Sequence, residues 1–514
     1  VTSAALLARA LSIGSAVSKT GTKNKPVAVY FDKCVNTISA MLGVVYSGNF
    51  YVVIDSEMPP ARINKIFGAL SPVAVITDKK HHENALQLEF SGDIYDLEEA
   101  LSCKINSEKL TQIRSRQIDT DPLYALFTSG STGVPKGAVV SHKSVMAYSE
   151  WVSNTFDITS ETVFANQTPF YFSMSVTDVY STLRNGATLA IVPKMYFSFP
   201  IKLVEFLDEY KANTIYWVPS AISMVSNFKV FDFQKPKYLN KVLFAGEVMP
   251  TKQLNYWINN LPENTLFANL YGPTETTDIC TYYVVNRKFR DDEPLPIGRH
   301  CDNCDVMIVN DKGVEAKPGE EGELYARGSF LASGYYNNPD KTKAAFVQNP
   351  LNDAYPETVY KTGDLVRLNE FGELMYITRK DFQIKHMGRR IELGEIENRI
   401  NNIDGVTTCD SIYDLAQKKI VLFYQGSIEK IDLINMAKDK LTNYMMPNKV
   451  IKIEKMPYNA NGKITKEITK GAYTETVSKT VGGTTYTYGE WHMHNVKEIA
   501  YAYNAIVYTL LRIF

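Results

Sequence analysis

The sequence predicts an α/β protein with a large N-terminal domain of layered sheets, a barrel-like subdomain and a small C-terminal α+β domain. Short β-branched runs, such as residues 26–31 and 51–54, alternate with amphipathic stretches, which favours parallel α/β layers. After about Pro294 the strand signals become short and are broken by Gly, Asn and Asp, which indicates antiparallel, barrel-like structure. Beyond Arg379 a helix signal (IELGEIENRINNI) and a strand signal (KKIVLFYQG) predict the small α+β domain.

The elements of the N-terminal part can be predicted in order. Residues 1–18 predict an amphipathic helix. They do not predict a signal peptide, because no basic start precedes their apolar run. Residues 26–31 predict a buried strand, and the stretch that follows, through Met41, predicts a helix. Further strand signals recur at residues 51–54, 73–77, 188–193, 214–219 and 241–246.

Length and composition restrict the class of protein. A chain of 514 residues exceeds one ordinary domain, so at least two compact units are expected. The 55 Lys and Arg against 56 Asp and Glu leave no broad basic field to hold a nucleic acid by its phosphates. Six scattered cysteines fit a reducing compartment. The longest apolar stretch, residues 499–514, falls short of the roughly 20 residues that span a bilayer. We therefore expect a cytoplasmic protein that binds neither nucleic acid nor membrane.

The segment LFTSGSTGVPKGAVVSH, residues 126–142, carries the clearest chemical signal. A strand runs into a loop whose glycines free backbone N–H groups to face an anion, while hydroxyls and a lysine add donors and charge. This combination suits a polyphosphate. It does not fit the Walker pattern GxxxxGK[ST], which disfavours a P-loop kinase or GTPase. The predicted phosphate-binding residues are Thr128, Ser129, Gly130, Ser131, Thr132, Gly133 and Lys136.

Five motifs, in order, resemble those of the adenylate-forming enzymes, which include acyl-CoA synthetases, luciferases and the adenylation domains of nonribosomal peptide synthetases. The phosphate loop is the first. NLYGPTETT (269–277) resembles the family's adenine and magnesium motif, and YKTGDLVRL (360–368) resembles its ribose motif. RKDFQIKHMGRRIELGEIE (379–397) resembles the hinge and thiolation motif, and NGKITK (461–466) the catalytic-lysine motif. The resemblance runs from the start of the chain to about Gly471, and it implies the adenylate-forming enzyme fold with a mobile C-terminal domain.

The resemblance implies ATP and Mg²⁺ as ligands, with residue roles that side-chain chemistry supports. Tyr271 offers an aromatic face for adenine, and the Asn269 amide can pair with the base edge. Glu275 is an oxygen ligand suited to Mg²⁺, and Thr274 can hydrogen-bond a phosphate oxygen. Lys463 resembles the lysine that stabilises charge while the substrate carboxylate attacks the α-phosphorus. The expected catalytic residues are Lys136, Thr274, Glu275 and Lys463. The other nucleotide-binding residues implied are Gly246, Glu247, Asp364 (ribose), Tyr376 and Arg379.

The resemblance also implies a hinge at Asp381, about which the C-terminal domain swings between an adenylating and a thioester-forming pose. Lys385 and Gly388 would then lie near an incoming phosphopantetheine arm. Thr378 stands where the family usually has Gly, and it is expected to stiffen the hinge or lower activity. The expected boundaries are 1–378 for the ATP- and acid-binding domain, 379–381 for the hinge, 382–471 for the C-terminal lid and 472–514 for an appended tail of unassigned role.

The implied acyl pocket departs from the amino-acid-activating pattern at one position. The segments YSGNFYVVIDSEMPPARI and FAGEVMP resemble the peptide-synthetase branch and the D-alanine-activating ligases, in which an Asp pairs with the substrate α-ammonium. Here that position is Ser173, and a buried ammonium without a carboxylate partner is costly. Either the substrate lacks an α-amine, or Asp278 supplies the carboxylate from the opposite wall. Trp217 either narrows the pocket or packs in the core. The implied pocket residues are Phe172, Ser173, Met174, Thr177, Trp217, Leu243, Ala245, Leu270, Asp278 and Ile279.

The function that the resemblance implies is ATP-dependent activation of a small carboxylic acid, an amino acid by slight preference, as acyl-AMP with release of pyrophosphate. Transfer to the phosphopantetheine thiol of a carrier protein then follows. The tail contains no Asp-Ser pair in a carrier-protein setting, so a separate carrier is the expected partner. The alternatives are an acyl- or aryl-CoA ligase, an activator of a hydroxy, keto or aryl acid, and a non-catalytic nucleotide-binding protein on the same fold.

Overall fold

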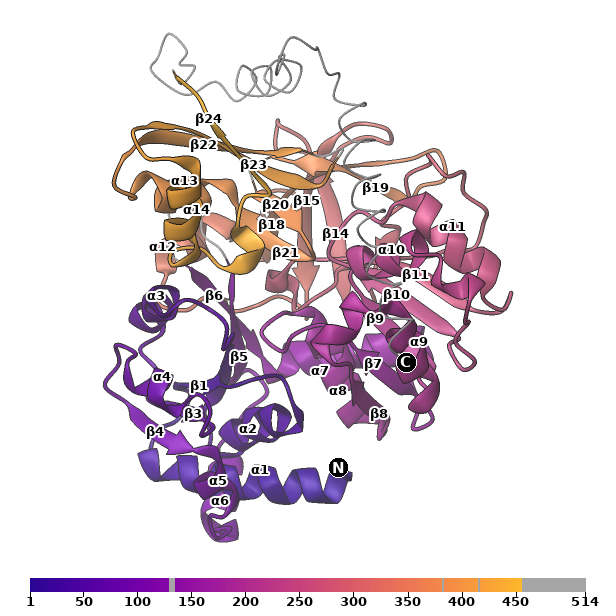
Figure 1. Ribbon diagram of the computed structural model, residues 1–514. Helices are drawn as coiled ribbons and strands as arrows, with labels where there is room; N and C mark the ends of the chain where they lie inside the picture. Colours follow the sequence, from indigo (N-terminus) through magenta and orange to yellow (C-terminus); the bar gives the residue numbers. More distant parts are fainter. Residues whose placement is uncertain (129–134, 381–382, 415–416, 455–514) are drawn as a thin grey trace, which may run out of the picture. The chain divides into compact units, whose positions relative to one another are not determined.

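The computed structural model, drawn in Figure 1, describes residues 1–128, 135–380, 383–414 and 417–454. The contacts within the chain divide it into two compact units. The first unit is Val1–Glu395 with Lys440–Tyr444. The second consists of the described residues of Ile396–Asp439 and Met445–Phe514. The predicted hinge includes Asp381, which lies outside the described residues, so the predicted domain boundaries stay predictions.

The first unit contains a seven-stranded sheet of order β16-β6-β5-β2-β1-β3-β4. Its strands β5, β2, β1, β3 and β4 are parallel, whereas β6 is antiparallel to β5 and β16 to β6. Strand β1 sends Val27 and Val29 into one apolar core and Ala28 and Tyr30 into another, so both faces of this sheet are covered. The strands are β1 (Pro26–Tyr30), β2 (Phe50–Ile54), β3 (Ala74–Thr77), β4 (Asp93–Asp96), β5 (Pro122–Thr128), β6 (Lys136–Ser141) and β16 (Gly334–Tyr335).

Six α-helices accompany this sheet in the sequence, and the predicted N-terminal helix is the first of them. The Thr2 hydroxyl caps α1 by accepting a hydrogen bond from the backbone of Ala5, and α1 packs against α2, α5 and α6 (Figure 1). The helices are α1 (Ser3–Val17), α2 (Val35–Tyr46), α3 (Pro60–Leu70), α4 (His82–Leu86), α5 (Leu97–Leu101) and α6 (Ser107–Arg114), with the 3-10 helix η1 (Ser18–Thr20).

A second seven-stranded sheet has the order β13-β12-β11-β10-β9-β7-β8 and shares an apolar core with the first. The strands predicted at 188–193, 214–219 and 241–246 are confirmed as β8, β9 and β10, and Pro219 begins α10 instead of closing β9. The strands are β7 (Val163–Asn166), β8 (Thr188–Ile191), β9 (Thr214–Trp217), β10 (Lys241–Ala245), β11 (Leu266–Tyr271), β12 (Thr281–Val284) and β13 (Arg299–His300). The helices are α7 (His142–Thr155), α8 (Met174–Asn185), α9 (Pro200–Glu209), α10 (Pro219–Asn227), α11 (Thr251–Asn260), η2 (Lys194–Ser198), η3 (Val230–Asp232) and η4 (Thr274–Thr276).

The antiparallel structure predicted after Pro294 is confirmed as a five-stranded sheet of order β14-β15-β18-β17, with β19 paired to β18. Its long strand β18 places Asp364 directly opposite Arg379 of β19. The elements are β14 (Cys304–Val309), β15 (Gly322–Gly328), α12 (Pro339–Ala345), β17 (Phe346–Gln348), β18 (Thr358–Leu368) and β19 (Leu374–Arg379).

The C-terminal part mixes strands and helices, as predicted. A hairpin of β20 (Gln383–His386) and β21 (Arg389–Glu392) belongs to the first unit and leads into α13 (Leu393–Asn401). In the second unit β22 (Val406–Asp414) is antiparallel and β24 (Lys449–Lys452) is parallel to the central strand β23 (Lys419–Gly426). Helix α14 (Lys430–Lys438) and η5 (Asn443–Met445) complete the described elements.

None of the helices in the described ranges combines the length and the apolarity needed to cross a membrane. The apolar stretch 499–514 and the rest of the predicted tail lie outside those ranges.

A buried polar cluster joins the two large sheets. The Lys33 ammonium, just after β1, donates hydrogen bonds to Oδ1 of Asn166 at 3.0 Å and to the carbonyl of Gln167 at 3.0 Å, at the end of β7. The Asn166 amide in turn donates to Oδ2 of Asp178 at 2.6 Å, whose other oxygen has no hydrogen-bond partner among the described residues. Burial raises the pKa of Asp178 to about 8, although Asn166 and Lys33 oppose this shift. Asp178 is therefore protonated at neutral pH.

The variant Asp178→Asn should make the protein's stability less sensitive to pH. An unfolded Asp ionises near pH 4, so between pH 4 and 8 unfolding releases a proton from Asp178. The wild type should therefore lose about 1.4 kcal/mol of stability per pH unit relative to the variant, with the difference levelling off above pH 8. Urea denaturation from pH 5 to 8 measures this difference. The same series on exposed Asp353→Asn is the control, and parallel curves for wild type and Asp178→Asn would contradict the prediction.

Candidate functional site

The first unit contains a cavity of about 1430 Å³ in which most of the predicted functional regions meet. The strand ends of both large sheets line it. Strands β18 and β19 of the five-stranded sheet and the β20–β21 hairpin line it as well. The predicted residues that line it are Thr128, Phe172, Ser173, Met174, Ala245, Gly246, Thr274, Asp278, Ile279, Asp364, Arg379, Lys385 and Gly388.

Glu275 lies behind this lining in a cluster of charges. Its side chain is 0% exposed on η4, and its Oε1 accepts a hydrogen bond from the Tyr335 hydroxyl at 2.6 Å. The Lys136 ammonium donates to the same hydroxyl at 3.0 Å and lies 3.6 Å from Oε1. Nη1 of Arg390 lies 3.1 and 3.3 Å from the two carboxylate oxygens. The structure thus brings two predicted residues together and adds two that were not predicted.

The charges around Glu275 keep it ionised in spite of its burial. Burial alone raises the pKa of this carboxyl, but Arg390 and Lys136 together lower it to about 2. Burial and the Arg390 charge lower the pKa of Lys136 to about 8. In the described ranges no group of three or more His, Cys, Asp and Glu side chains could hold a metal ion. A single ionised carboxylate fits Mg²⁺, which proteins often bind through one carboxylate together with substrate phosphates and water.

The predicted nucleotide-binding residues form a second cluster. The Tyr271 hydroxyl and Nη1 of Arg379 donate to the two oxygens of Asp364, the latter at 3.0 Å, so the predicted ribose carboxylate is held from two sides. The Lys385 ammonium lies 5.0 Å from the centre of the Tyr271 ring, and Tyr376 lies against the same ring with 6.2 Å between centroids. The amide nitrogen of Asn269, which was predicted to contact adenine, donates to the Pro296 carbonyl at 2.8 Å.

Glu247 holds the β20–β21 turn in place. Its two carboxylate oxygens accept hydrogen bonds from the backbone N–H of Gly388 at 3.0 Å and of Ser220 at 2.9 Å, the second residue of α10. Gly388 has a φ of +73°, and a Cβ at this position would lie only 2.3 Å from Cγ1 of Val218. The turn therefore fits against α10 only as long as residue 388 is a glycine.

In the acyl part of the cavity, Asp278 is the centre of a ring of hydroxyl groups. This side chain is 2% exposed, and its Oδ2 accepts hydrogen bonds from Tyr148 at 3.0 Å, Thr177 at 3.0 Å and Tyr216 at 2.9 Å. Burial raises the pKa of Asp278, and the hydroxyl hydrogen bonds, including one from Ser173, oppose that shift. Ser173, which stands where the family pattern has Asp, therefore belongs to the same polar cluster as the Asp278 carboxylate.

The remaining predicted pocket residues lie deeper. Trp217 is 0% exposed, donates its indole N–H to the Ala165 carbonyl at 2.8 Å and packs edge-on against Phe197, which lines the cavity. Its place is in the core, behind the cavity wall. Leu243 and Leu270 are likewise buried in the shared core.

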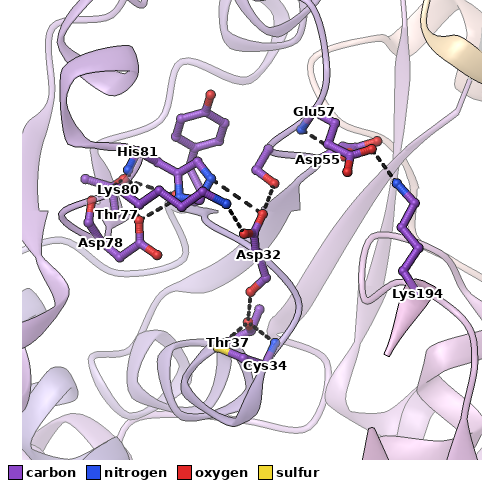
Figure 2. Close-up of polar contacts among 12 residues, drawn as sticks. Asp32, Cys34, Thr37, Asp55, Glu57, Thr77, Asp78, Lys80, His81 and Lys194 are labelled. Atoms are coloured by element: carbon purple, nitrogen blue, oxygen red, sulfur yellow. Dashed lines mark hydrogen bonds and ion pairs between the residues drawn. The ribbon is translucent and has the colours of Figure 1, made fainter. Parts of the chain in front are cut away.

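The segments that follow β1, β2 and β3 contribute a charged network that sequence reasoning missed. Figure 2 shows Asp32 at its centre, where Oδ2 contacts the Lys80 ammonium at 2.6 Å and Oδ1 lies 3.5 Å from Nε2 of His81. His81 also contacts Asp78 through Nδ1 at 2.6 Å. These residues follow the carboxyl ends of parallel strands, where polar side chains of such sheets commonly gather. Applied to the strands already predicted, that rule could have indicated these residues.

Several predicted site residues lie outside the described ranges. They are the loop residues Ser129, Gly130, Ser131, Thr132 and Gly133, the hinge residue Asp381 and the catalytic Lys463. The prediction lacked Tyr335 and Arg390. Tyr335 comes directly after Gly334, and Arg390 lies inside the hinge motif. No feature of the sequence alone connects either of them to Glu275.

Comparison with known proteins identifies the family. A family model described as AMP-binding enzyme matches residues 1–336. The L-proline–[L-prolyl-carrier protein] ligase of Streptomyces coelicolor is 31% identical over 491 residues, which cover 89% of this chain and 88% of the relative. The D-alanine–D-alanyl carrier protein ligase of Lacticaseibacillus rhamnosus is 30% identical over 459 residues, covering 86% and 88%. The chain therefore belongs to the AMP-binding enzymes, and it is an adenylate-forming ligase that activates a carboxylic acid with ATP.

Solved structures show the same fold. The Vibrio cholerae adenylation domain AlmE, in complex with glycyl-adenosine-5′-phosphate, superposes with a TM-score of 0.77 at 22% sequence identity, covering 91% of this chain and 92% of that one. The predicted fold class is confirmed by this likeness.

Proposed function

We propose that this ligase activates an amino acid as aminoacyl-AMP and transfers the aminoacyl group to the phosphopantetheine thiol of a separate carrier protein. The main support is the cavity that both Asp364 and Asp278 line, with Glu275 directly after the lining residue Thr274. The Asp364 carboxylate suits a ribose, that of Glu275 a magnesium ion, and that of Asp278 an ammonium group. The relatives named as proline and D-alanine carrier-protein ligases support the same reaction.

In the first step an oxygen of the substrate carboxylate attacks the α-phosphorus of ATP. The new P–O bond gives the acyl-AMP. The bond between the α-phosphorus and the oxygen that bridges to the β-phosphate breaks, which releases pyrophosphate. Glu275 would hold Mg²⁺, which would supply positive charge for the pyrophosphate as it leaves. Lys136 binds phosphate oxygens, and Lys463 stabilises the charge that develops at the reacting phosphate.

In the second step the thiol sulfur attacks the acyl carbon. A thioester forms, the bond to AMP breaks, and the thiol proton passes to solvent. We assign the contacts of Arg390 with Glu275 and of Lys385 with the Tyr271 ring to this step. Arg390 occupies the position at Glu275 that Mg²⁺ needs in the first step, and Lys385 occupies the face of Tyr271 that adenine needs. The β20–β21 turn would therefore have to leave before ATP binds. The proposed hinge at Asp381 gives it that freedom.

The substrate ammonium is proposed to pair with Asp278, because Ser173 offers no charge. The carboxylate is buried, and an ammonium beside it would be far better stabilised than one facing only hydroxyl groups. A second candidate is a hydroxy or keto acid. It is favoured by the hydroxyls of Tyr148, Thr177 and Tyr216, which already supply hydrogen bonds to Asp278.

ATP–pyrophosphate exchange with a panel of acids tests the proposal. The panel pairs each small amino acid with the hydroxy and keto acids of the same carbon skeleton. We expect exchange with one or a few amino acids, and a loss of about 10²-fold or more in the variant Lys463→Ala while ATP binding changes far less. Exchange with only the hydroxy or keto member of a pair would replace the amino acid by the second candidate. No exchange with any acid, or equal loss of ATP binding in the variant, would refute the proposed catalysis.

A further inference from the structure

Tyr335 makes a contact that neither the motifs nor the proposed reaction includes. Its hydroxyl lies between Lys136 and Glu275, accepting from the ammonium at 3.0 Å and donating to Oε1 of the carboxylate at 2.6 Å. The ammonium also lies 4.6 Å from the centre of the Tyr335 ring. One side chain thus contacts both the cation proposed for phosphate and the carboxylate proposed for Mg²⁺.

The position of this hydroxyl is fixed by the surrounding structure. Tyr335 is 5% exposed on the short strand β16, which pairs with β6, the strand that begins at Lys136. Its backbone N–H donates to Oγ1 of Thr342 at 2.9 Å, and its ring packs edge-on against Phe346. Gly334, just before it, has a φ of +123°, and a Cβ there would lie 2.5 Å from Thr342. Because its backbone is held by Thr342 and its ring by Phe346, the Tyr335 side chain keeps a single orientation.

We infer that Tyr335 is a positioning residue for the metal–phosphate end of the site. Its O–H takes one lone pair of Oε1 and so fixes the plane of the Glu275 carboxylate, as hydrogen bonds from neighbouring residues do for many metal ligands. Its oxygen also holds the ammonium of Lys136 3.6 Å from that carboxylate. The ammonium and the carboxylate already form an ion pair at this distance, and without the hydroxyl they would draw closer and each would be withdrawn from the nucleotide.

This inference rests on the proposed function, because it assigns Glu275 to Mg²⁺ and Lys136 to phosphate. It predicts a much larger effect on the first step than on the second. Transfer from an acyl-AMP already formed involves neither the metal nor pyrophosphate, and in that step Arg390 already holds both oxygens of Glu275 at 3.1 and 3.3 Å, so it should depend far less on Tyr335. A merely structural role would impair both steps, since they share one cavity.

The test is the variant Tyr335→Phe, with Tyr336→Phe on the neighbouring residue as the matched control. Binding of Mn²⁺·ATP by electron paramagnetic resonance, adenylation by pyrophosphate exchange, and thioester formation from synthetic acyl-AMP are measured separately. We expect Mn²⁺·ATP affinity and the adenylation rate to fall by about 10- to 100-fold in Tyr335→Phe. Thioester formation should stay within about twofold, and Tyr336→Phe should leave all three unchanged.

Two outcomes would overturn the inference. One is Mn²⁺·ATP binding within about twofold of wild type in Tyr335→Phe, and the other is an equal loss of adenylation and thioester formation. Failure of the proposed function looks different, because the wild type would then show no exchange with any acid. The Mn²⁺·ATP measurement would still report whether Tyr335 supports the metal–nucleotide site.

Discussion

The variant Glu275→Gln should lower the rate of acyl-adenylate formation by roughly 10²–10³-fold, the range seen when one group that stabilises transition-state charge is removed. The amide keeps the shape of the side chain but loses its charge, so it is a poor Mg²⁺ ligand. It also leaves Lys136 without the carboxylate that lies 3.6 Å from its ammonium. Pyrophosphate exchange across a magnesium titration measures the effect.

The magnesium titration distinguishes metal binding from general damage. If Glu275 holds the ion, the variant should need a higher magnesium concentration for half-maximal exchange, in addition to its lower maximum. The exposed residue Glu321, changed to Gln, is the control and should match the wild type. Exchange in Glu275→Gln within about threefold of wild type would show that this carboxylate is not the metal ligand.

The variant Gly388→Ala should lose about 10- to 100-fold in thioester formation while it keeps adenylation. The new methyl group would collide with Val218 at 2.3 Å, and the turn at φ +73° would also be strained. The turn would therefore be displaced from α10 and from Glu247, which accepts the Gly388 N–H. Thioester formation from synthetic acyl-AMP and pyrophosphate exchange, measured side by side, report the two steps.

A matched glycine separates the collision from the strain. Gly372 has the same φ of +73°, but a Cβ added there would have nothing within 4 Å, so Gly372→Ala carries the backbone strain alone. The double variant Gly388→Ala, Val218→Ala removes the 2.3 Å contact with Cγ1 of Val218, although the Cβ of residue 218 stays at 3.2 Å, and it should recover part of the lost transfer rate. Equal loss in the Gly372 variant, or equal loss of adenylation in Gly388→Ala, would contradict the role assigned to this turn.

The alternation of strands and helices could be predicted because it is a local property of the chain. Buried parallel strands need continuous apolar runs, and β1 and β2 lie within one residue of the predicted ranges. The switch to antiparallel strands after Pro294 could be predicted for the same reason, from short runs broken by turn residues. The small strand β16 gave no signal, because two residues carry no periodicity.

The candidate site was predictable only where its residues fall inside motifs. Asp364 and Arg379 were both predicted, and the pairing of β18 with β19 makes them neighbours. Trp217 could not be placed, because an apolar residue on a buried strand has the same pattern whether it faces the cavity or the core. The partners of Asp278 come from α7, α8 and β9, and no spacing in the sequence relates those elements.

The sequence by itself determined the order of the layers, the family and the identity of the charged residues that the chemistry requires, because periodicity and motifs depend on neighbours along the chain. Only the tertiary structure decided which charges meet. Tyr335 and Arg390 reach Glu275 from 60 and 115 residues away, and the balance of burial and opposite charge at that carboxylate exists only after folding. Electrostatic interactions depend on distance in space and on exclusion of water, and neither quantity is written in the linear order of residues.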